Sequence, residues 1–324
     1  MKRDVTISYI DLFDGLKKEL IKTSYSFCSD TDKKNILNNL SPCWVYYPWN
    51  KQLFKILEEK EFIKVRTSRN NYKITEEEQI GLSKKKIGVV GLSVGRSVST
   101  TIAMERSCGA LRLADFDELE LSNLNRIKAP LKDIGQLKTV STAREIKEFD
   151  PYFDVQLFSD GITNENLNDF FLENGKLDLV IDECDSLEMK ILLRKKAKEI
   201  GVPVVMDTSD RGMVDIERYD LDSNLEYFHG RIAGFDPSYT WKITSEQRQT
   251  LLAQILDLNN LSEKAKYSLS EIGKSITTWP KLASSIVLGG GVTAELCRRI
   301  LLGEKVPSGR FYIDLEELIP NGRE

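Results

Sequence analysis

The chain has 324 residues, of which 46 are basic and 50 acidic, with five scattered cysteines and one histidine. Its net charge of −4, without long blocks of one sign, argues against a nucleic-acid-binding surface, and no run approaches the roughly 20 apolar residues of a membrane helix. No signal peptide is expected, because acidic residues interrupt the run after the basic start. Because no CxxC pair is present, no zinc site is expected, and the cysteines are expected to be reduced thiols. These features predict a cytoplasmic, enzyme-sized protein of one or two domains.

Residues 1–66 are rich in aromatic and charged side chains and contain no glycine loop. Helical spacing over Ile10–Ile21 is followed by a strand-like run at Trp44–Tyr47, which ends at Pro48, and by an amphipathic segment at Gln52–Leu57. This small α+β region has two interpretations. It is either a packing extension of the main sheet or a peptide-docking module, because short strands beside exposed aromatic side chains can accept an added strand.

Residues 67–324 form the main domain, and their first part alternates short apolar strands with helices. Strands are expected at 87–90, 111–114, 155–158, 177–181 and 202–206, and helices near 97–107, 139–149, 164–172 and 187–200. This alternation predicts parallel strands with right-handed crossovers and helices on both faces. The fold class is therefore a doubly wound, mostly parallel, Rossmann-like α/β sheet.

The pattern changes after the fifth strand. Residues 214–219 alternate like an antiparallel strand, and residues 220–282, with a helix near 245–259, are interpreted as an insertion on the substrate side. A last helix through residue 301 and a strand at 309–314 are expected to return to the main sheet. Arg211 and His229 are candidates for the substrate side, although such residues are more often solvated or structural.

A glycine loop, GLSVGRS, follows the first strand and contains Gly91, Ser93 and Gly95. The second and third glycines of a dinucleotide fingerprint are replaced by Ser93 and Arg96, so a tight turn without a ligand remains an alternative. The unpaired amides of the following helix can still bind an anion, and Arg96 is expected to add positive charge there.

Polar residues also follow the second strand. Asp115 lies 24 residues after Gly91, at a position where a carboxylate can accept ribose hydroxyls, although an ordinary strand-end cap is the alternative. Asn123, Arg126 and Lys138 then supply an amide and two cations. A ribose with a triphosphate needs such cations more than a hydride carrier does, so the pattern favours ATP over a nicotinamide cofactor.

Three acids, Asp182, Glu183 and Asp185, occur within four residues at the end of the fourth strand. Magnesium prefers one or two carboxylates, with water and phosphate oxygens completing its octahedron. The cluster therefore predicts a magnesium site, with Asp185 as its ligand. Cys184, between these acids, is interpreted as a small buried filler rather than a nucleophile.

The segments LADFDELELSNLNR, IGQLK and VIDECD, in this order, resemble the adenylation domain of ThiF and MoeB proteins and of ubiquitin-activating enzymes. The resemblance covers roughly residues 65–220 and implies binding of ATP and magnesium, formation of an acyl adenylate from a carboxyl group, and release of pyrophosphate. It also implies residue roles: Asp115 would hold the ribose, Asn123, Arg126 and Lys138 the phosphates, and Asp185 the magnesium, while Gly91, Ser93, Gly95 and Asp117 complete the nucleotide site.

Arg69 precedes the first strand and would ordinarily be a solvated surface charge. By the same resemblance, it matches an arginine that reaches across a dimer into the partner's site. The resemblance therefore implies that Arg69 is catalytic and that the protein is a homodimer.

The chain departs from the family pattern in lacking paired CxxC zinc ligands and a cysteine placed for a thioester step, so direct capture of the adenylate is expected. A narrower similarity, carried by GLSVGRS and TSDRGMVDIERYD, is to ThiF-like enzymes that modify ribosomally made peptides in natural-product and antibiotic biosynthesis, such as the pantocin enzyme PaaA. It implies activation of a glutamate side chain in a precursor peptide, followed by cyclisation.

The favoured hypothesis is thus an ATP-dependent adenylating enzyme that acts on a peptide carboxylate. Activation of the C-terminus of a small ubiquitin-like or sulfur-carrier protein is the first alternative. A non-catalytic peptide-binding scaffold, suggested by Ser93 and Arg96, is the second, and a nicotinamide oxidoreductase is the third.

Overall fold

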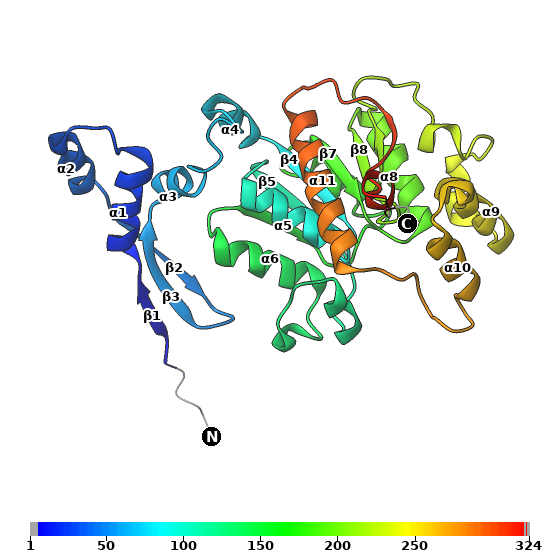
Figure 1. Ribbon diagram of the computed structural model, residues 1–324, viewed down its shortest axis with the longest axis horizontal. Helices are drawn as coiled ribbons and strands as arrows, with labels where there is room; N and C mark the ends of the chain where they lie inside the picture. Colours follow the sequence, from blue (N-terminus) through cyan, green and yellow to red (C-terminus); the bar gives the residue numbers. More distant parts are fainter. Residues whose placement is uncertain (1–5, 321, 323–324) are drawn as a thin grey trace. The chain divides into compact units, whose positions relative to one another are not determined.

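The computed structural model describes residues 6–320 and 322, and the chain divides into two compact units (Figure 1). One unit is built from Met1–Gln79 and Lys147–Tyr152, and the other from Ile80–Ile146 and Phe153–Glu324. The functional division after residue 66 stays a prediction. Within the described part of the chain, no helix is both long and apolar enough to cross a membrane.

The first unit contains a three-stranded sheet in the order β1-β3-β2, with β1 parallel and β2 antiparallel to β3. Its elements are β1 (Ser8–Asp11), α1 (Phe13–Ser24), α2 (Asp30–Asn38), β2 (Pro42–Tyr47), β3 (Gln52–Leu57) and α3 (Glu59–Arg66). Phe13, Leu20 and Leu57 form its buried core. The segment 147–152 joins this unit because the Tyr152 hydroxyl donates to the Leu57 carbonyl at 2.7 Å.

A short helix, α4 (Glu76–Leu82), follows Thr75. The Thr75 hydroxyl accepts a hydrogen bond from the Glu78 amide at 3.2 Å, and the Glu78 carboxylate accepts one from the Thr75 amide at 2.8 Å. This reciprocal pair is the capping box that the residue pattern favours.

The second unit is built on a seven-stranded sheet in the order β10-β9-β8-β7-β4-β5-β6. The strands β6, β5, β4, β7 and β8 pair in parallel with one another along this order, whereas β9 pairs antiparallel with both β8 and β10. The strands are β4 (Lys86–Val90), β5 (Ala110–Ala114), β6 (Asp154–Phe158), β7 (Leu179–Asp182), β8 (Val204–Asp207), β9 (Met213–Glu217) and β10 (Gly309–Tyr312). The predicted mostly parallel α/β sheet is thereby confirmed.

Helices cover both faces of this sheet (Figure 1). One face packs against α7 (Leu167–Leu172) and α8 (Leu187–Ile200), whose Phe170, Phe171 and Leu193 join the strands in one core. The other face carries α5 (Gly95–Glu105), α6 (Lys138–Phe149) and α11 (Ala283–Leu301). The remaining helices, α9 (Ser245–Leu256), α10 (Glu263–Glu271) and α12 (Leu315–Leu318), follow β9 or β10 in the chain.

Residues between β9 and α11 pack onto α8 through a small core of their own. Phe228, Leu251 and Ile255 are buried there against Leu187 and Ile191. The segment thus supplies apolar side chains close to the carboxyl ends of β7 and β8.

Candidate functional site

The site is the place where the strand order reverses. From β4 the sheet continues on one side through β5 and β6, and on the other through β7 and β8. In open α/β sheets, ligands bind outside the carboxyl ends of strands at such a point. The loops after β4, β5 and β7 carry nearly all of the site residues that the sequence predicts.

The loop after β4 turns at Gly91, which has a φ of +90°. A Cβ added to Gly91 would lie 2.4 Å from the carbonyl oxygen of Glu183, so only glycine allows the loops after β4 and β7 to approach this closely. Gly95 begins α5, and a Cβ there would lie 2.7 Å from a methyl group of Val89. Close packing, against the Glu183 backbone for Gly91 and against the Val89 side chain for Gly95, explains both glycines.

Asp115 anchors this loop to the end of β5. Its Oδ2 accepts the Leu92 amide at 2.6 Å and its Oδ1 accepts the Asp117 amide at 2.8 Å. Burial raises the pKa of Asp115, which is 8% exposed. Each carboxylate oxygen can accept a second hydrogen bond, so the group retains the capacity that the predicted ribose contact requires.

Arg126 connects the loop after β5 to the loop after β4. Its Nε donates to the Ser93 hydroxyl at 3.0 Å, and it follows a 3-10 turn, Leu121–Asn125, in which Asn123 is 6% exposed and accepts the Glu120 amide at 3.2 Å. Burial lowers the pKa of Arg126, and the charge of Asp185 opposes that shift. The guanidinium is thus partly withdrawn from water.

Lys138, the first residue of α6, is the second cation of the site. It is 5% exposed, and its Nζ lies 2.7 Å from Oδ2 of Asp117. Its amide also donates to the Asp117 carbonyl at 2.9 Å. The structure therefore brings together Arg126 with Ser93, and Lys138 with Asp117, around the anchored carboxylate of Asp115.

Arg96 does not contribute the charge that the sequence suggested. Its guanidinium pairs with Glu145 at 2.8 Å and donates to the Ser141 hydroxyl at 2.9 Å, both on α6. Only 5% of Arg96 is exposed. Its role is to hold α5 against α6, because a neutralised and buried guanidinium cannot serve an anion at the loop.

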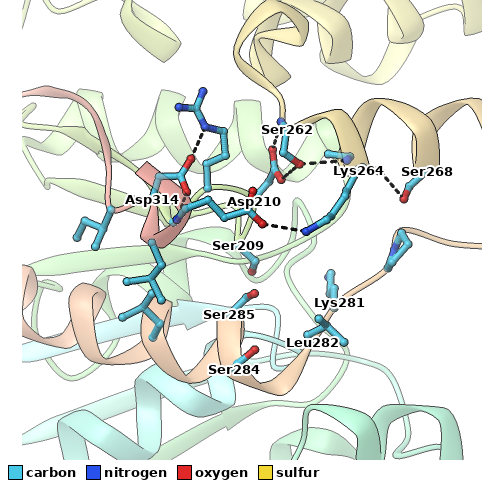
Figure 2. A pocket seen from close by; sticks show the side chains of 18 of the residues that line it. Ser209, Asp210, Ser262, Lys264, Ser268, Lys281, Leu282, Ser284, Ser285 and Asp314 are labelled. Carbon is cyan, nitrogen blue, oxygen red and sulfur yellow. Dashed lines mark hydrogen bonds and ion pairs between the residues drawn. The ribbon is translucent and has the colours of Figure 1, made fainter. Parts of the chain in front are cut away.

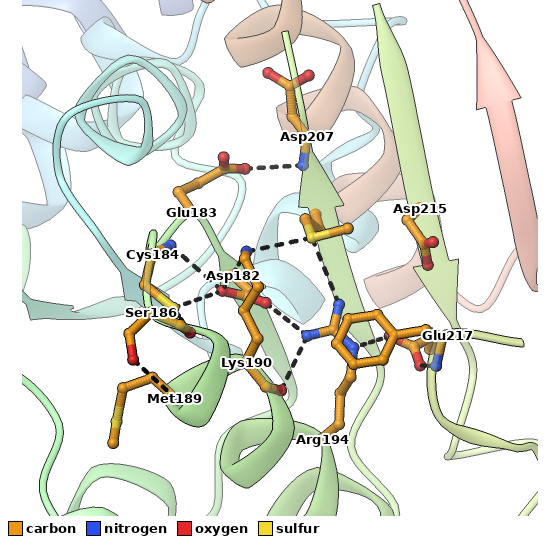
Figure 3. A network of polar contacts seen from close by, with 12 residues as sticks. Asp182, Glu183, Cys184, Ser186, Met189, Lys190, Arg194, Asp207, Asp215 and Glu217 are labelled. Carbon is orange, nitrogen blue, oxygen red and sulfur yellow. Dashed lines mark hydrogen bonds and ion pairs between the residues drawn. The ribbon is translucent and has the colours of Figure 1, made fainter. Parts of the chain in front are cut away.

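The three acids after β7 do not form the predicted metal cluster. Asp182 is fully buried and pairs with Arg194 at 2.6 Å and with Lys190 at 3.2 Å (Figure 3). Burial alone would raise the pKa of Asp182, but the two cations outweigh it and lower that pKa to about 2. Arg194 also pairs with the buried Glu217, so this network holds β7, α8 and β9 together.

Glu183 and Asp185 point to different surroundings. Glu183 is buried, which raises its pKa well above the usual value, and it accepts the Asp207 amide at 3.1 Å (Figure 3). The Asp185 side chain is 92% exposed and lies 3.7 Å from Nζ of Lys281. Residues 6–320 and 322 contain no group of three His, Cys, Asp or Glu side chains that could hold a metal. Of these three acids, Asp185 is the one whose carboxylate is exposed and available to bind magnesium.

Cys184 lies among these acids and is partly buried. Its Sγ is 3.0 Å from Oδ1 of Asp182, and burial raises its pKa well above the usual value. Since the thiolate is the nucleophilic form, this environment does not activate the sulfur.

Arg69 belongs to the first unit, whereas the strand-end residues belong to the second. It is exposed and lines a hollow of about 510 Å³ that Lys18, Lys22 and Arg66 also line. Its predicted role in a partner's site stays a prediction.

Arg211 is engaged in ion pairs and His229 in a hydrogen bond, both within the second unit. Arg211 pairs with Asp314 at 2.7 Å and with Glu317, and Nε2 of His229 lies 2.9 Å from Asp215. These contacts support a structural role for each residue.

Two adjoining pockets are lined in part by residues 220–282, the segment interpreted from the sequence as an insertion on the substrate side, and Asp185 lines the inner one. The inner pocket, of about 210 Å³, is lined by Glu183, Asp185, Lys190, Asp207, Trp279 and Lys281, with apolar walls from α9. The outer pocket, of about 420 Å³, is rich in serine hydroxyls (Figure 2). Both pockets are lined by Ser209, Asp210, Trp279 and Lys281, so they are neighbours.

Lys281 is the main site residue that sequence reasoning missed. Its carbonyl accepts a hydrogen bond from the Asn125 side chain at 2.8 Å, and its ammonium faces Asp185. The segment around it has no periodic pattern, so no signal along the chain places it beside the nucleotide loop.

The strand ends of this Rossmann-like sheet bring together the hydrogen-bonded acid Asp115 and two partly buried cations, Arg126 and Lys138. This arrangement defines a protein of the nucleotide-binding class. The model of the ThiF family matches residues 67–312, and the chain belongs to this family. This membership supports a nucleotide site and adenylation chemistry in general terms.

One relative is uncharacterized protein MT1398 of Mycobacterium tuberculosis, which is 44% identical over 272 residues. The match covers 84% of this chain but 38% of that protein, so the chain spans well under half of the relative's length.

Three solved structures share the fold at low identity. PaaA has a TM-score of 0.52 and 17% identity, with 78% of this chain and 81% of PaaA covered. The Escherichia coli tRNA threonylcarbamoyladenosine dehydratase TcdA, in complex with ATP, has a TM-score of 0.51 and 18% identity, with 74% and 95% covered. The microcin C7 biosynthetic enzyme MccB, in complex with N-formylated MccA, has a TM-score of 0.52 and 16% identity, with 93% and 88% covered.

Proposed function

We propose that this protein uses ATP to adenylate a carboxylate and releases pyrophosphate. The observation that carries the proposal is the pair of cations, Arg126 and Lys138, held by Ser93 and Asp117 on loops that flank Asp115. A carboxylate that attacks the α-phosphate brings two anions together. Catalysis is then mainly positioning and charge neutralisation, and it needs no general base.

In this proposal Asp115 accepts the ribose hydroxyls, and Asn123, Arg126 and Lys138 contact the phosphates. The backbone at Gly91, Ser93 and Gly95 approaches the nucleotide, because the amides at the start of α5 carry positive partial charge. Asp117 holds Lys138 in place, since its carboxylate and carbonyl contact both ends of that residue.

Magnesium would be held by Asp185, whose open carboxylate suits an ion that also takes water and phosphate oxygens. The bound ion would supply further neutralisation of phosphate charge. Lys281, at 3.7 Å, would have to give up its contact with Asp185 for the ion to bind.

Arg69 is proposed to act in a partner subunit of a homodimer. Mixing two inactive variants tests this directly, one carrying Arg69→Ala and the other Lys138→Ala. If Arg69 acts across the dimer, random reassembly restores about a quarter of the sites, because one site of each mixed dimer has both residues. If Arg69 acts within its own subunit, no site recovers.

The carboxylate is proposed to belong to a peptide, with the first unit as its docking module. Tyr9 and Trp44 are both 52% exposed, and their rings stack at 5.5 Å across the small sheet. Its outer strands, β1 and β2, each pair on one side with β3 among the described strands, so a peptide strand can add to an edge. MccB in complex with MccA supports a substrate of this kind by analogy.

The alternative is the C-terminus of a small ubiquitin-like or sulfur-carrier protein. Pull-down of purified candidate peptides and candidate carrier proteins with the full chain distinguishes the two alternatives. Trp44→Ala should weaken the binding of a peptide that docks on the small sheet.

Calorimetric titration with ATP and magnesium tests the nucleotide site without a carboxylate substrate. We expect binding to the unaltered chain and a loss of about tenfold or more in affinity for Arg126→Ala and Lys138→Ala. Undiminished binding in both variants would refute the assigned phosphate contacts.

A further inference from the structure

Four basic side chains line the inner and outer pockets, and three of them are held by carboxylates at hydrogen-bond distance. These three pairs are Lys190 with Asp182 at 3.2 Å, Arg211 with Asp314 at 2.7 Å and Lys264 with Glu316 at 2.8 Å. The fourth is Lys281, whose ammonium has no hydrogen-bond acceptor in the described part of the chain and lies 3.7 Å from Asp185. Lys281 is therefore the cation of these pockets that is available to an anionic ligand.

The ammonium of Lys281 is also largely withdrawn from water. The Lys281 side chain is 16% exposed, whereas the side chain of its partner Asp185 is 92% exposed. A pair with so exposed a carboxylate is screened by solvent and stabilises little. A mostly buried ammonium without a hydrogen bond carries a desolvation cost, which a bound anion would offset.

The backbone of Lys281 is tied to the proposed phosphate site through one amide side chain. Nδ2 of Asn125 donates to the Lys281 carbonyl at 2.8 Å, and Oδ1 of Asn125 accepts from Nη1 of Arg126 at 2.9 Å. Lys281 therefore extends from a backbone position that is fixed relative to the cation proposed to contact the phosphates.

The outer pocket offers an anion further donors and a route to Lys281. Its volume of about 420 Å³ lies within the roughly 300 to 1,000 Å³ of typical ligand pockets. Three of its hydroxyls make no hydrogen bond among the described residues, those of Ser209, Ser284 and Ser285 (Figure 2). Asp210 lines both pockets as well, but its carboxylate already accepts the amide and the hydroxyl of Ser262.

Two acids of the inner pocket oppose an anion less than their number suggests. Burial raises the pKa of Glu183 well above its usual value, so this side chain is neutral near pH 7. Oδ2 of Asp207 packs against α11, because a Cβ added to Gly289 would lie 2.0 Å from it. Neither carboxyl group competes for the Lys281 ammonium through an ion pair among the described residues.

We propose that Lys281 binds the carboxylate of the substrate where the two pockets meet and presents it to the α-phosphate of ATP. The inference rests on the proposed adenylation and names the residue that holds its second substrate. One carboxylate oxygen then forms a bond to the α-phosphorus while the bond to pyrophosphate breaks, and the electron pair of that bond leaves with pyrophosphate. Lys281 exchanges its contact with Asp185 for the substrate carboxylate.

The binding test uses pentanoate as the probe and pentanamide as its neutral match, with the full chain, EDTA and no ATP. Calorimetry should show pentanoate binding about tenfold or more tightly than pentanamide, a preference that Lys281→Met removes and Lys281→Arg keeps. Lys274→Met is the control and should leave binding unchanged, because Lys274 is exposed and lines neither pocket. Asp185→Asn removes the competing carboxylate and should tighten pentanoate binding by up to about fivefold.

Equal binding of pentanoate and pentanamide, or a preference that Lys281→Met retains, overturns the proposal. Weaker pentanoate binding in Asp185→Asn also overturns it, since an ammonium that holds the probe gains when a competing carboxylate is removed.

ATP itself is the other source of an anion for Lys281, and titrations with ATP and with pyrophosphate distinguish the two sources. Lys281→Met should keep both affinities within about twofold, which also shows that this variant is folded. A loss of about tenfold or more in either affinity would assign Lys281 to the phosphates and overturn the proposal.

Steady-state kinetics of AMP formation separates this inference from the proposed function. With a glutamate-bearing peptide as the substrate, Lys281→Met should raise the KM for the peptide by about tenfold or more and leave the KM for ATP unchanged. AMP formation with an unchanged KM for the peptide in Lys281→Met would refute the role of Lys281 alone. Pentanoate binding that requires Lys281, without AMP formation, would refute adenylation and leave Lys281 as a carboxylate-binding residue.

Discussion

Arg126 donates a hydrogen bond from Nε to the hydroxyl of Ser93 at 3.0 Å, and this contact joins the loops that follow β5 and β4. The two residues lie 33 positions apart in the chain. The contact orients a cation across the point where the strand order reverses, which is where we propose that the phosphates of ATP bind.

Arg126→Ala should therefore lower the rate of ATP-dependent pyrophosphate release by about 100-fold or more, because a positioned cation at developing charge is worth several kcal/mol. Ser93→Ala removes only the orienting hydroxyl and should cost about tenfold. Steady-state assays of pyrophosphate release check both variants, once circular dichroism has verified that they are folded to the same extent. Equal losses in the two variants would show that the hydroxyl, and not the charge, is what matters.

Asp207 should make stability fall as pH rises. Burial raises its pKa from 3.8 to about 6, so between these values the native state binds more protons than the unfolded state. The free energy of unfolding then decreases through that window by about 3 kcal/mol.

Asp207→Asn keeps the size of the side chain and the acceptor for the Ser209 amide. We expect it to raise the free energy of unfolding by up to about 3 kcal/mol at pH 7, with no gain at pH 3.5. Urea titrations at the two pH values measure this. An equal gain at both pH values would contradict the shifted pKa.

Two glycine positions of α11, two residues apart, give a matched pair of variants. A Cβ on Gly289 would lie 2.0 Å from Oδ2 of Asp207, whereas a Cβ on Gly291 would meet nothing within 4 Å. We expect Gly289→Ala to destabilise the protein by about 1 to 3 kcal/mol through overpacking, and Gly291→Ala to stabilise it by up to about 1 kcal/mol. Thermal unfolding of both variants checks the sign, and a stabilising Gly289→Ala would show that Asp207 is not packed against α11.

Arg194 should be among the most sensitive positions for folding. Arg194→Met would leave Asp182 and Glu217 as buried carboxylates without their shared partner, at a cost of about 3 to 5 kcal/mol. Lys195→Met, at an exposed position on the same helix, should change stability by less than about 0.5 kcal/mol. Similar urea midpoints for the two variants would contradict the network in Figure 3.

Local signals explain what could be predicted from the sequence. Helix α8 begins and ends as expected because the Ser186 hydroxyl accepts the Met189 amide and Gly201 takes the left-handed conformation at the C-cap. The first helix was expected from Ile10, but Ser8–Asp11 form β1 instead. That strand depends on β3, about forty residues away, and no local pattern records such pairing.

The same limit applies to the site. Asp115, Arg126 and Lys138 could be found because each follows a recognisable strand or motif. The acids after β7 suggested a metal cluster because Arg194, which neutralises Asp182, lies on the next helix and pairs also with Glu217 of β9. Lys281 and the unpaired Asp207 are brought to the site only by tertiary packing.

The central claim is that ATP is cleaved between its α- and β-phosphates at this site. The most direct measurement is to identify the products of radiolabelled ATP turned over by the full chain with magnesium and a library of peptides that bear free carboxylates. We predict AMP and pyrophosphate as products, and the loss of both in Lys138→Ala and in Asp185→Ala with folding intact. Formation of ADP and phosphate, or AMP formation that both variants retain, would contradict it.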